Sequence, residues 1–209
     1  MHPIKLLGLS GSPRDGATAF AVRQALSYAT SLGDIETEFI SLKGKKIEFC
    51  IHCDHCIRTK QGCVFQDDVS EFYPSLEAAD AWLLATPVYQ GTLSGQLKAV
   101  LDRCRAIVAR NPEALKHKAG AAVAVGGDRV GGQERAILTI HTFYLVNRMI
   151  PVAGGPFGAN LGGTVWSQDQ GAKGAEADQV GMKTVHRTVK RLVEFARLLK
   201  GPAEPSLNV

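Results

Sequence analysis

The chain has 209 residues, a length that fits one α/β domain spanning residues 1–209. Hydrophobic residues make up 45% and charged residues 21%, and the net charge of +4 is spread along the chain, which argues against a nucleic-acid partner. No apolar run approaches the roughly 20 residues that cross a bilayer, and the first residues lack the pattern of a secretory signal, so we expect a cytoplasmic protein without membrane association.

The first elements follow the pattern of a strand, a loop and a helix. Residues 4–9 form a nearly continuous apolar run, typical of a strand buried on both faces, and the glycine-containing loop SGSPRDGAT follows directly. Apolar residues then recur at helical spacing from Ala21 to Leu32, and Gly33 stands where a helix cap is expected. This arrangement is typical of the start of an α/β domain.

A second strand and a cysteine-rich segment come next. Residues 35–41 alternate polar and apolar side chains, as in a half-exposed edge strand. Residues 48–68 contain four of the five cysteines and are predicted to be an insertion after this strand. Asp68, with Glu71 three residues later, predicts the start of the following helix, because both side chains can satisfy the first free amides.

The alternation of strands and helices continues through the middle of the chain. Buried strands are expected at residues 81–85 and 119–127. A helix is predicted to start at Ser94, and a longer one to cover residues 133–149.

The last third of the chain is less regular. Residues 151–178 are rich in glycine and poor in periodicity, and we expect an irregular segment with one short strand at 150–153. A final amphipathic helix is predicted around residues 182–199. Strands that alternate with helices predict a parallel sheet covered on both faces, with a ligand beyond the carboxyl ends of the strands.

The first loop has the composition of a phosphate-binding loop. Ser10, Ser12 and Thr18 supply hydroxyl groups, and Gly11 and Gly16 let backbone amides turn toward an anion at the start of a helix. The loop lacks the GK[ST] of a Walker loop and the GxGxxG of dinucleotide folds, so a phosphate monoester such as that of FMN fits better than a triphosphate. The same residues also suit an ordinary turn between a strand and a helix.

The second loop, TPVYQG, follows a buried strand and offers a place for a flat ring. Pro87 and Gly91 would hold the backbone in a defined turn, and Tyr89 would lie beside the ring. A packing role for Tyr89 is equally compatible with the sequence.

Together with a third loop, these segments resemble a known family. GLSGSPRDGAT, TPVYQGTLSGQLKAVLDR and AVAVGGDRVGGQE are similar in order and spacing to the FMN-binding loops of the NADPH-dependent FMN reductase family, over most of residues 4–150. The resemblance implies a flavodoxin-like three-layer sandwich with a five-stranded parallel sheet. It also implies the FMN contacts: Ser10, Ser12, Arg14, Ala17 and Thr18 at the phosphate, and Pro87, Val88, Tyr89, Gly91, Gly126, Gly127 and Asp128 along the isoalloxazine ring.

The spacing of the clustered cysteines predicts a metal site. Cys50, Cys53, Cys56 and Cys63 follow the pattern CxxCxxC, with the fourth cysteine after six further residues. Closely stepped thiolates of this kind can wrap one 4Fe–4S cluster. Zinc is the alternative, although Cys₄ zinc sites are usually built from two separated CxxC pairs, and free thiols without a metal are a further alternative.

The same run resembles that of the iron–sulfur flavoproteins, a branch of this family that carries FMN and one 4Fe–4S cluster. All four cysteine positions of the branch have a match here, and Asp67 and Asp68 also fit its pattern. We interpret His52 and His55 as loop residues without an assigned role, and Cys104 as a buried small side chain on the apolar face of its helix.

These features predict a flavin-dependent oxidoreductase in which the flavin carries out the chemistry, so no catalytic side chain is assigned. A cluster passes single electrons and a flavin exchanges one or two, which suits conversion between one-electron and two-electron carriers, with a small molecule as acceptor. The resemblance implies a ferredoxin-like electron donor. The resemblance implies a homodimer or homotetramer in which the cluster of one subunit lies near the flavin of another. Two alternatives stay open: an NAD(P)H-dependent FMN or quinone reductase with FMN only and a zinc or thiol loop, and a non-catalytic redox sensor.

Overall fold

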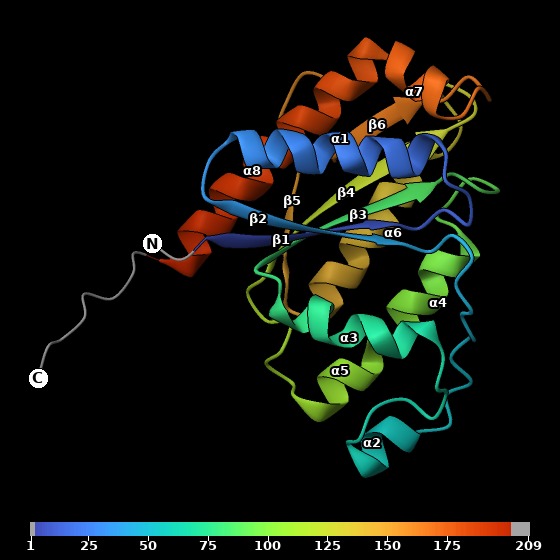
Figure 1. Ribbon diagram of the computed structural model, residues 1–209, viewed down its shortest axis with the longest axis vertical. Helices are drawn as coiled ribbons and strands as arrows, with labels where there is room; N and C mark the ends of the chain where they lie inside the picture. The colour runs from blue at the N-terminus through green and yellow to red at the C-terminus, as the bar shows by residue number, and fades with distance from the viewer. Residues whose placement is uncertain (1–2, 202–209) are drawn as a thin grey trace, which may run out of the picture.

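The computed structural model describes residues 3–201, in which helices cover both faces of one sheet (Figure 1). The strands are β1 (Ile4–Ser10), β2 (Ile35–Ser41), β3 (Ala81–Pro87), β4 (Ala119–Gly126), β5 (Ile150–Val152) and β6 (Gly163–Trp166). The helices are α1 (Ala17–Ser31), α2 (His55–Thr59), α3 (Asp68–Ala78), α4 (Gly95–Arg103), α5 (Arg105–Arg110), α6 (Gln133–Val146), α7 (Ala172–Ala177) and α8 (Gln179–Lys200). No helix within the described residues is both long and apolar enough to cross a membrane.

The sheet is parallel, in the order β2-β1-β3-β4-β5. The sixth strand, β6, also pairs with β4: β5 pairs with residues 119–121 of β4, and β6 pairs with residues 123–126. The two short strands therefore occupy the same edge of β4, one after the other. The predicted five-stranded parallel sheet is confirmed, with one additional short strand at its edge.

The burial of each strand agrees with its sequence pattern. β3 and β4 are buried along their whole length, because helices cover both faces of the sheet there. β2 lies at the edge, and its polar residues Glu36, Thr37 and Glu38 are exposed while Ile35 and Ile40 are buried. The alternating sequence pattern of β2 therefore predicted its edge position correctly.

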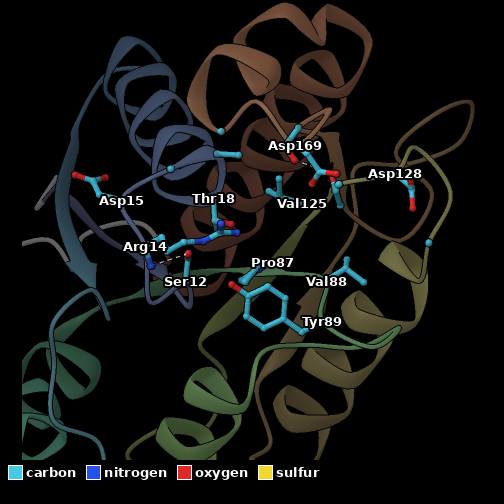
Figure 2. A pocket seen from close by; sticks show the side chains of 17 residues that line it. Ser12, Arg14, Asp15, Thr18, Pro87, Val88, Tyr89, Val125, Asp128 and Asp169 are labelled. Atoms are coloured by element: carbon cyan, nitrogen blue, oxygen red, sulfur yellow. Dashed lines mark hydrogen bonds between the residues drawn. The ribbon is translucent and has the colours of Figure 1, made fainter.

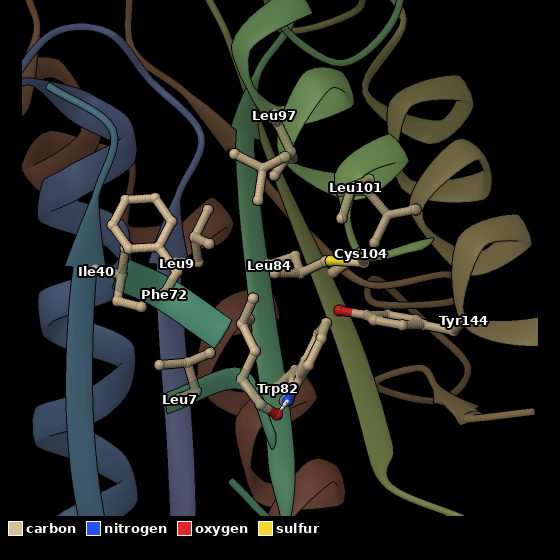
Figure 3. Packing of buried hydrophobic residues seen from close by; sticks show 14 of the residues in the cluster. Leu7, Leu9, Ile40, Phe72, Trp82, Leu84, Leu97, Leu101, Cys104 and Tyr144 are labelled. Atoms are coloured by element: carbon tan, nitrogen blue, oxygen red, sulfur yellow. Dashed lines mark hydrogen bonds between the residues drawn. The ribbon is translucent and has the colours of Figure 1, made fainter. Parts of the chain in front are cut away.

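Two apolar cores lie on opposite faces of the sheet. One is formed with α1, α7 and α8, and the other, shown in Figure 3, with α3, α4, α5 and α6. In the second core the indole N–H of Trp82 donates to the carbonyl of Leu76 at 3.0 Å. The Tyr144 hydroxyl donates to the carbonyl of Ala121 at 2.8 Å, and its ring lies so close to Gly120 that a Cβ there would come within 2.7 Å of it. Both buried polar groups are therefore satisfied without leaving the core.

Two helix starts show how capping residues position the loops. Ser94 caps α4 as predicted, because its Oγ accepts a hydrogen bond from the Leu97 amide at 3.2 Å. The cap of α3 is Asp67 and not the predicted Asp68: Asp67 has an extended backbone and accepts from the Val69 amide, whereas Asp68 is already helical. The Asp68 carboxylate instead binds Lys45, at 2.7 Å from its Nζ.

Residues 151–178 contain more regular structure than the sequence indicated. The strand expected at 150–153 is present as β5, but β6 and α7 lie in the part expected to be irregular. β6 has 4 residues and α7 has 6, so neither is long enough for its periodicity to stand out. The final helix is longer than predicted, and α6 ends at Val146, three residues before the predicted end.

Candidate functional site

A cavity of about 580 Å³ lies at the carboxyl ends of β1, β3 and β4 (Figure 2). This is where the strand order reverses between β1 and β3, the usual ligand position in an open α/β sheet. The predicted residues that line the cavity are Ser12, Arg14, Ala17, Thr18, Pro87, Val88, Tyr89, Gly126, Gly127 and Asp128. The fold therefore brings the three predicted loops together around one space.

The first loop surrounds the N-terminus of α1. Gly16 precedes this helix and supplies no side-chain cap, so the first helical amides are available to an anion. The Oγ of Ser12 accepts a hydrogen bond from the Arg14 amide at 3.1 Å, which fixes the turn of the loop. Arg14 is the only basic residue on the cavity wall and has no carboxylate partner among residues 3–201. This end of the cavity is thus suited to a negative charge.

Two of the predicted contact residues, Ser10 and Gly91, do not line the cavity. Ser10 is completely buried at the end of β1, and its hydroxyl has no hydrogen-bond partner in the described structure. Gly91 has a φ of 78° and packs against the third loop, where a Cβ on Gly132 would lie 2.7 Å from the Gly91 Cα. Both residues are therefore outside the lining of the cavity, although each belongs to a loop that contributes other residues to it.

The second loop is a tight turn held by backbone hydrogen bonds. The Tyr89 amide donates to the Thr92 carbonyl at 2.9 Å, and the Thr92 amide donates back to the Tyr89 carbonyl at 3.1 Å. The Val88 amide donates to the Val125 carbonyl at 2.9 Å, which joins the turn to the end of β4. Figure 2 shows the Tyr89 ring below Pro87 and beside the cavity. The turn thus presents an aromatic ring and a rigid backbone to the same space.

Gln133 organises the third loop, a role that the sequence reading did not assign. Its side-chain amide donates to the carbonyls of Asp128 at 2.7 Å and Arg129 at 3.2 Å, and its oxygen accepts from the Gly131 amide at 2.8 Å. The side chain is buried, with 5% of the residue exposed. Its position at the start of a helix after two glycines was the only signal in the sequence, and many helices start with a polar residue of this kind.

A fourth segment, between β6 and α7, completes the cavity wall with Ser167, Asp169 and Gly171. The Ser167 hydroxyl donates to the Gly126 carbonyl at 3.0 Å, which ties this segment to the third loop. Asp169 has a φ of 52°, an uncommon backbone conformation for a residue with a side chain. These residues belong to the stretch without periodicity, and the polar run SQDQG after Trp166 was the only indication of a turn there.

The cysteine segment, residues 48–68, lies apart from the cavity and contributes no residue to its wall. In Figure 1 it runs from the carboxyl end of β2 past α3 and reaches the far side of α5, where it forms the short helix α2. The ion pair between Asp54 and Arg105, at 2.6 Å, attaches this part of the segment to α5. The insertion predicted after the second strand is therefore present, on the face of the sheet that α3 and α5 cover.

All four cysteines of the segment are free thiols. Cys50 and Cys53 are exposed, while Cys56 and Cys63 are half-buried. Within the described residues, no three or more His, Cys, Asp or Glu side chains are grouped so that they could hold a metal ion. The metal site predicted from the cysteine spacing thus stays a prediction.

Cys104 and His141 take structural positions. Cys104 is buried between α4 and α5, and burial raises the pKa of its thiol to about 12, which makes it unreactive at neutral pH. His141 is buried in α6, and its Nε2 donates to the Leu161 carbonyl at 2.6 Å. Burial lowers the pKa of His141, so its ring is neutral at neutral pH.

The chain matches known proteins over nearly its whole length. Residues 4–163 match the family described as NADPH-dependent FMN reductase. An iron–sulfur flavoprotein of Methanocaldococcus jannaschii is 51% identical over 95% of this chain and 100% of that protein. An iron–sulfur flavoprotein of Archaeoglobus fulgidus is 47% identical over 94% of this chain and 99% of that protein.

A solved structure confirms the fold. The WrbA-like flavodoxin from Agrobacterium tumefaciens superposes on this chain with a TM-score of 0.66 at 14% identity, over 93% of this chain and 98% of that one. The predicted flavodoxin-like fold is thus confirmed, and the matched family makes the protein a flavin-dependent oxidoreductase. This chain belongs to the NADPH-dependent FMN reductase family and, within it, to the iron–sulfur flavoprotein branch.

Proposed function

We propose that this protein binds FMN in the cavity and one 4Fe–4S cluster at Cys50, Cys53, Cys56 and Cys63, and that it transfers electrons between a ferredoxin-like one-electron carrier and a small-molecule acceptor. The observation that carries the proposal is the cavity at the carboxyl ends of β1, β3 and β4. Its wall combines a helix N-terminus that lacks a side-chain cap, an arginine without a carboxylate partner among the described residues, an aromatic ring and glycine backbone. These are complementary to the phosphate and the flat ring of a flavin mononucleotide.

The phosphate fits the end of the cavity that α1 forms. Ser12 and Thr18 supply hydroxyl donors there, Arg14 supplies a charge, and the first amides of α1 have no side-chain partner. A phosphate would gain charge-assisted hydrogen bonds from all of them.

The isoalloxazine ring fits the end of the cavity between the second and third loops. Tyr89 and the backbone of Pro87 would lie beside the ring, and Gly126 and Gly127 would allow the third loop to approach it. A Cβ on Gly126 would lie 2.6 Å from the Asp128 carbonyl, so the loop keeps its shape only with glycine there. When bound, FMN exchanges either single electrons or a hydride, and the residues of the chain bind and orient it.

The cysteine segment suits a cluster in the type and number of its donors. Four free thiols supply the ligands that one 4Fe–4S cluster needs. Between the cysteines, His52, Asp54 and Lys60 have positive φ values of 53°, 58° and 58°, so the chain reverses direction repeatedly over a short distance. These turns support a compact wrapping of one metal group, with zinc as the competing occupant.

The separation of the cavity from the cysteine segment supports electron transfer between copies of the chain. We therefore include in the proposal a homodimer or homotetramer in which the cysteine segment of one subunit lies near the flavin of another. We also propose a cytoplasmic location, because four thiols stay available as metal ligands only in a reducing compartment.

A second candidate function keeps FMN but has no iron–sulfur cluster. In this case the protein is an NAD(P)H-dependent FMN or quinone reductase with a zinc-binding or thiol loop. The observation that favours its thiol form is that the four cysteines are not grouped as metal ligands in the described structure.

Cofactor analysis of one preparation separates the two candidates. The protein is purified without oxygen, and iron, acid-labile sulfide, zinc and FMN are measured per chain. About four irons and four sulfides with one FMN support the first function. FMN with zinc, or FMN without a metal, contradicts it. Rapid mixing with NADPH and, separately, with reduced ferredoxin then identifies the donor, because FMN bleaches faster with the physiological class of donor.

A further inference from the structure

Arg103 connects both ends of the cysteine segment. It is the last residue of α4, and its side chain is completely buried, at 0% exposed. We call residues 46–49 and 64–67, which precede Cys50 and follow Cys63, the two stems. The guanidinium donates to the first stem at the Glu48 carbonyl, at 3.3 Å, and to the second stem at the Phe65 carbonyl, at 3.1 Å. One side chain thus holds two stems that are separated by the whole run of cysteines.

Asp67 completes this connection. Its carboxylate, only 2% exposed, lies 2.5 Å from Nη1 of Arg103. It also accepts a hydrogen bond from the Glu48 amide at 2.8 Å and caps α3 through the Val69 amide at 3.2 Å. Glu48 is therefore bonded at its amide by Asp67 and at its carbonyl by Arg103.

The chemistry of a buried ion pair indicates that this contact fixes the positions of the stems and does not mainly add stability. Removing two charges from water has a high cost, and well-packed apolar side chains would fill the same space at least as stably. The planar guanidinium offers several donors in a fixed arrangement, which an apolar residue or a lysine does not. Here those donors bind backbone carbonyls of two separate stems. The Arg103–Asp67 pair therefore sets the distance between the stems.

We propose that Arg103 is a positioning residue that, with Asp67, holds the two stems at the spacing in which Cys50 and Cys63 can bind the same metal group. This inference rests on the proposed function, because it assumes that the cysteines bind a cluster. Two further contacts agree with it: Cys56 and Cys63 pack against the core beside α4 and α5, and Arg105 binds Asp54 in the middle of the segment. The junction of α4 and α5 thus supports the segment at its ends and at its centre.

We call Arg103 and Asp67, which together bind the two stems, the clasp. The first experiment tests in the metal-free protein whether the clasp holds the stems. Hydrogen exchange is followed at single amides in the wild type and in Arg103→Met. We expect exchange of the Glu48 amide to accelerate about tenfold or more, because its acceptor Asp67 loses the buried cation that holds it. The Lys46 amide, which donates to Asp68 at 2.6 Å, is an internal control in the same stem and keeps its rate. Equal acceleration at both amides, or at neither, overturns the assignment of Arg103 as the clasp.

The second experiment tests the consequence for metal binding. Wild type, Arg103→Met, Arg103→Lys and Arg110→Met are reconstituted without oxygen, and iron, sulfide, FMN and the cluster absorption are measured. Loss of a residue that orients metal ligands lowers metal affinity about 10- to 100-fold, and we expect this for Arg103→Met with FMN unchanged. Arg103→Lys keeps the charge but cannot reach both stems, so its iron content is expected to lie closer to that of Arg103→Met. Arg110, on α5 and paired with Glu77, is the matched control and keeps full iron content.

The outcomes separate this inference from the proposed function. If the wild type binds iron and Arg103→Met binds it with the same affinity, the role of the clasp is overturned and the proposed function stays intact. The same conclusion follows if Arg103→Lys has the full iron content of the wild type. A wild type that takes up no iron overturns the proposed function and the metal-binding role of the clasp together. FMN content serves as the fold control, since a variant that retains FMN and loses iron has a defect confined to the cysteine segment.

Discussion

The hydroxyl of Ser94 donates to the carbonyl of Gly11 at 2.6 Å, although the two residues are 83 positions apart in the chain. The same oxygen accepts from the Leu97 amide and caps α4, and the Ser94 amide donates to the Thr86 hydroxyl at 2.9 Å. One small side chain thus joins the first loop of the cavity to the second. Because Ser94 is fully buried, no water molecule can easily replace these bonds.

Ser94→Ala is expected to lower stability and to weaken FMN binding. Loss of the cap and of one buried hydrogen bond should lower the free energy of unfolding by about 1–2 kcal/mol. Urea unfolding of the FMN-free protein measures this change, and titration with FMN measures affinity. Ser31→Ala is the control, because within residues 3–201 the Ser31 hydroxyl bonds only to the Tyr28 carbonyl, on an exposed helix end. A Ser94→Ala protein as stable as Ser31→Ala would contradict the role of the link.

Gly126→Ala is expected to disturb the third loop. The added methyl group would lie 2.6 Å from the Asp128 carbonyl and would also displace the Gln133 side chain, so the loop must shift. We expect a loss of about 1–3 kcal/mol in stability and a lower affinity for FMN. Gly95→Ala is the matched control, since a Cβ there meets no atom within 4 Å and alanine favours the helix. Equal effects of the two substitutions would rule out the close packing of the loop as the cause.

Cys56→Ala is expected to lose the cluster and retain FMN. The cavity wall contains no residue of the cysteine segment, so the two cofactors should separate cleanly. Cys104→Ala provides the comparison, because Cys104 is also a free cysteine but is buried between α4 and α5. We expect Cys104→Ala to retain both iron and FMN. Simultaneous loss of iron and FMN from a folded Cys56→Ala protein would contradict the proposed separation.

Stability should depend on the ionisation of Asp67 in acid. Burial opposes the charged carboxylate, but the hydrogen bonds from Arg103 and from the Glu48 amide outweigh it, so the pKa of Asp67 is lowered. A lowered pKa contributes stability that is fully present above the unfolded pKa of about 4 and is lost as the pH falls through the folded pKa. At pH 7 we expect Asp67→Asn to lose about 3 kcal/mol, because Arg103 is left buried without its partner.

Urea unfolding of the metal-free protein at neutral and at acid pH checks this prediction. The difference between wild type and Asp67→Asn should shrink as the pH falls below about 4 and through the lowered pKa of Asp67 in the folded protein, where the wild-type carboxyl also takes up a proton. Asp102→Asn removes an exposed partner of Lys98 and should change stability little at either pH. A difference for Asp67→Asn that is independent of pH would argue against an ionised pair.

Much of the fold was predictable because its signals are local. The buried runs of β3 and β4, the alternation in β2 and the cap at Ser94 each depend on residues close together in the chain, and all three agree with the structure. Short elements were missed for the same reason: β6 and α7 are too brief to show a period. β6 is stabilised by its pairing with β4 and its packing on α8, and α7 by its packing on α1, and none of these contacts is visible in the sequence.

The cavity was predictable to the extent that its loops follow predictable strands. Because parallel strands end at one edge of a sheet, the loops after β1, β3 and β4 had to meet, and most of the residues assigned to them line one space. The order and composition of these loops, the family and the spacing of the cysteines were therefore accessible from the chain alone.

Contacts between distant segments required the folded structure. Only three-dimensional packing places Asp169 at the cavity and leaves Gly91 out of its lining. It also bonds Gln133 to the backbone of the third loop and brings Arg103 from the end of α4 to Asp67 and the stems of the cysteine segment. It also separates the cysteine segment from the cavity. These relationships arise from the packing of whole elements, and a pattern of neighbouring residues carries no information about which distant partner each side chain meets.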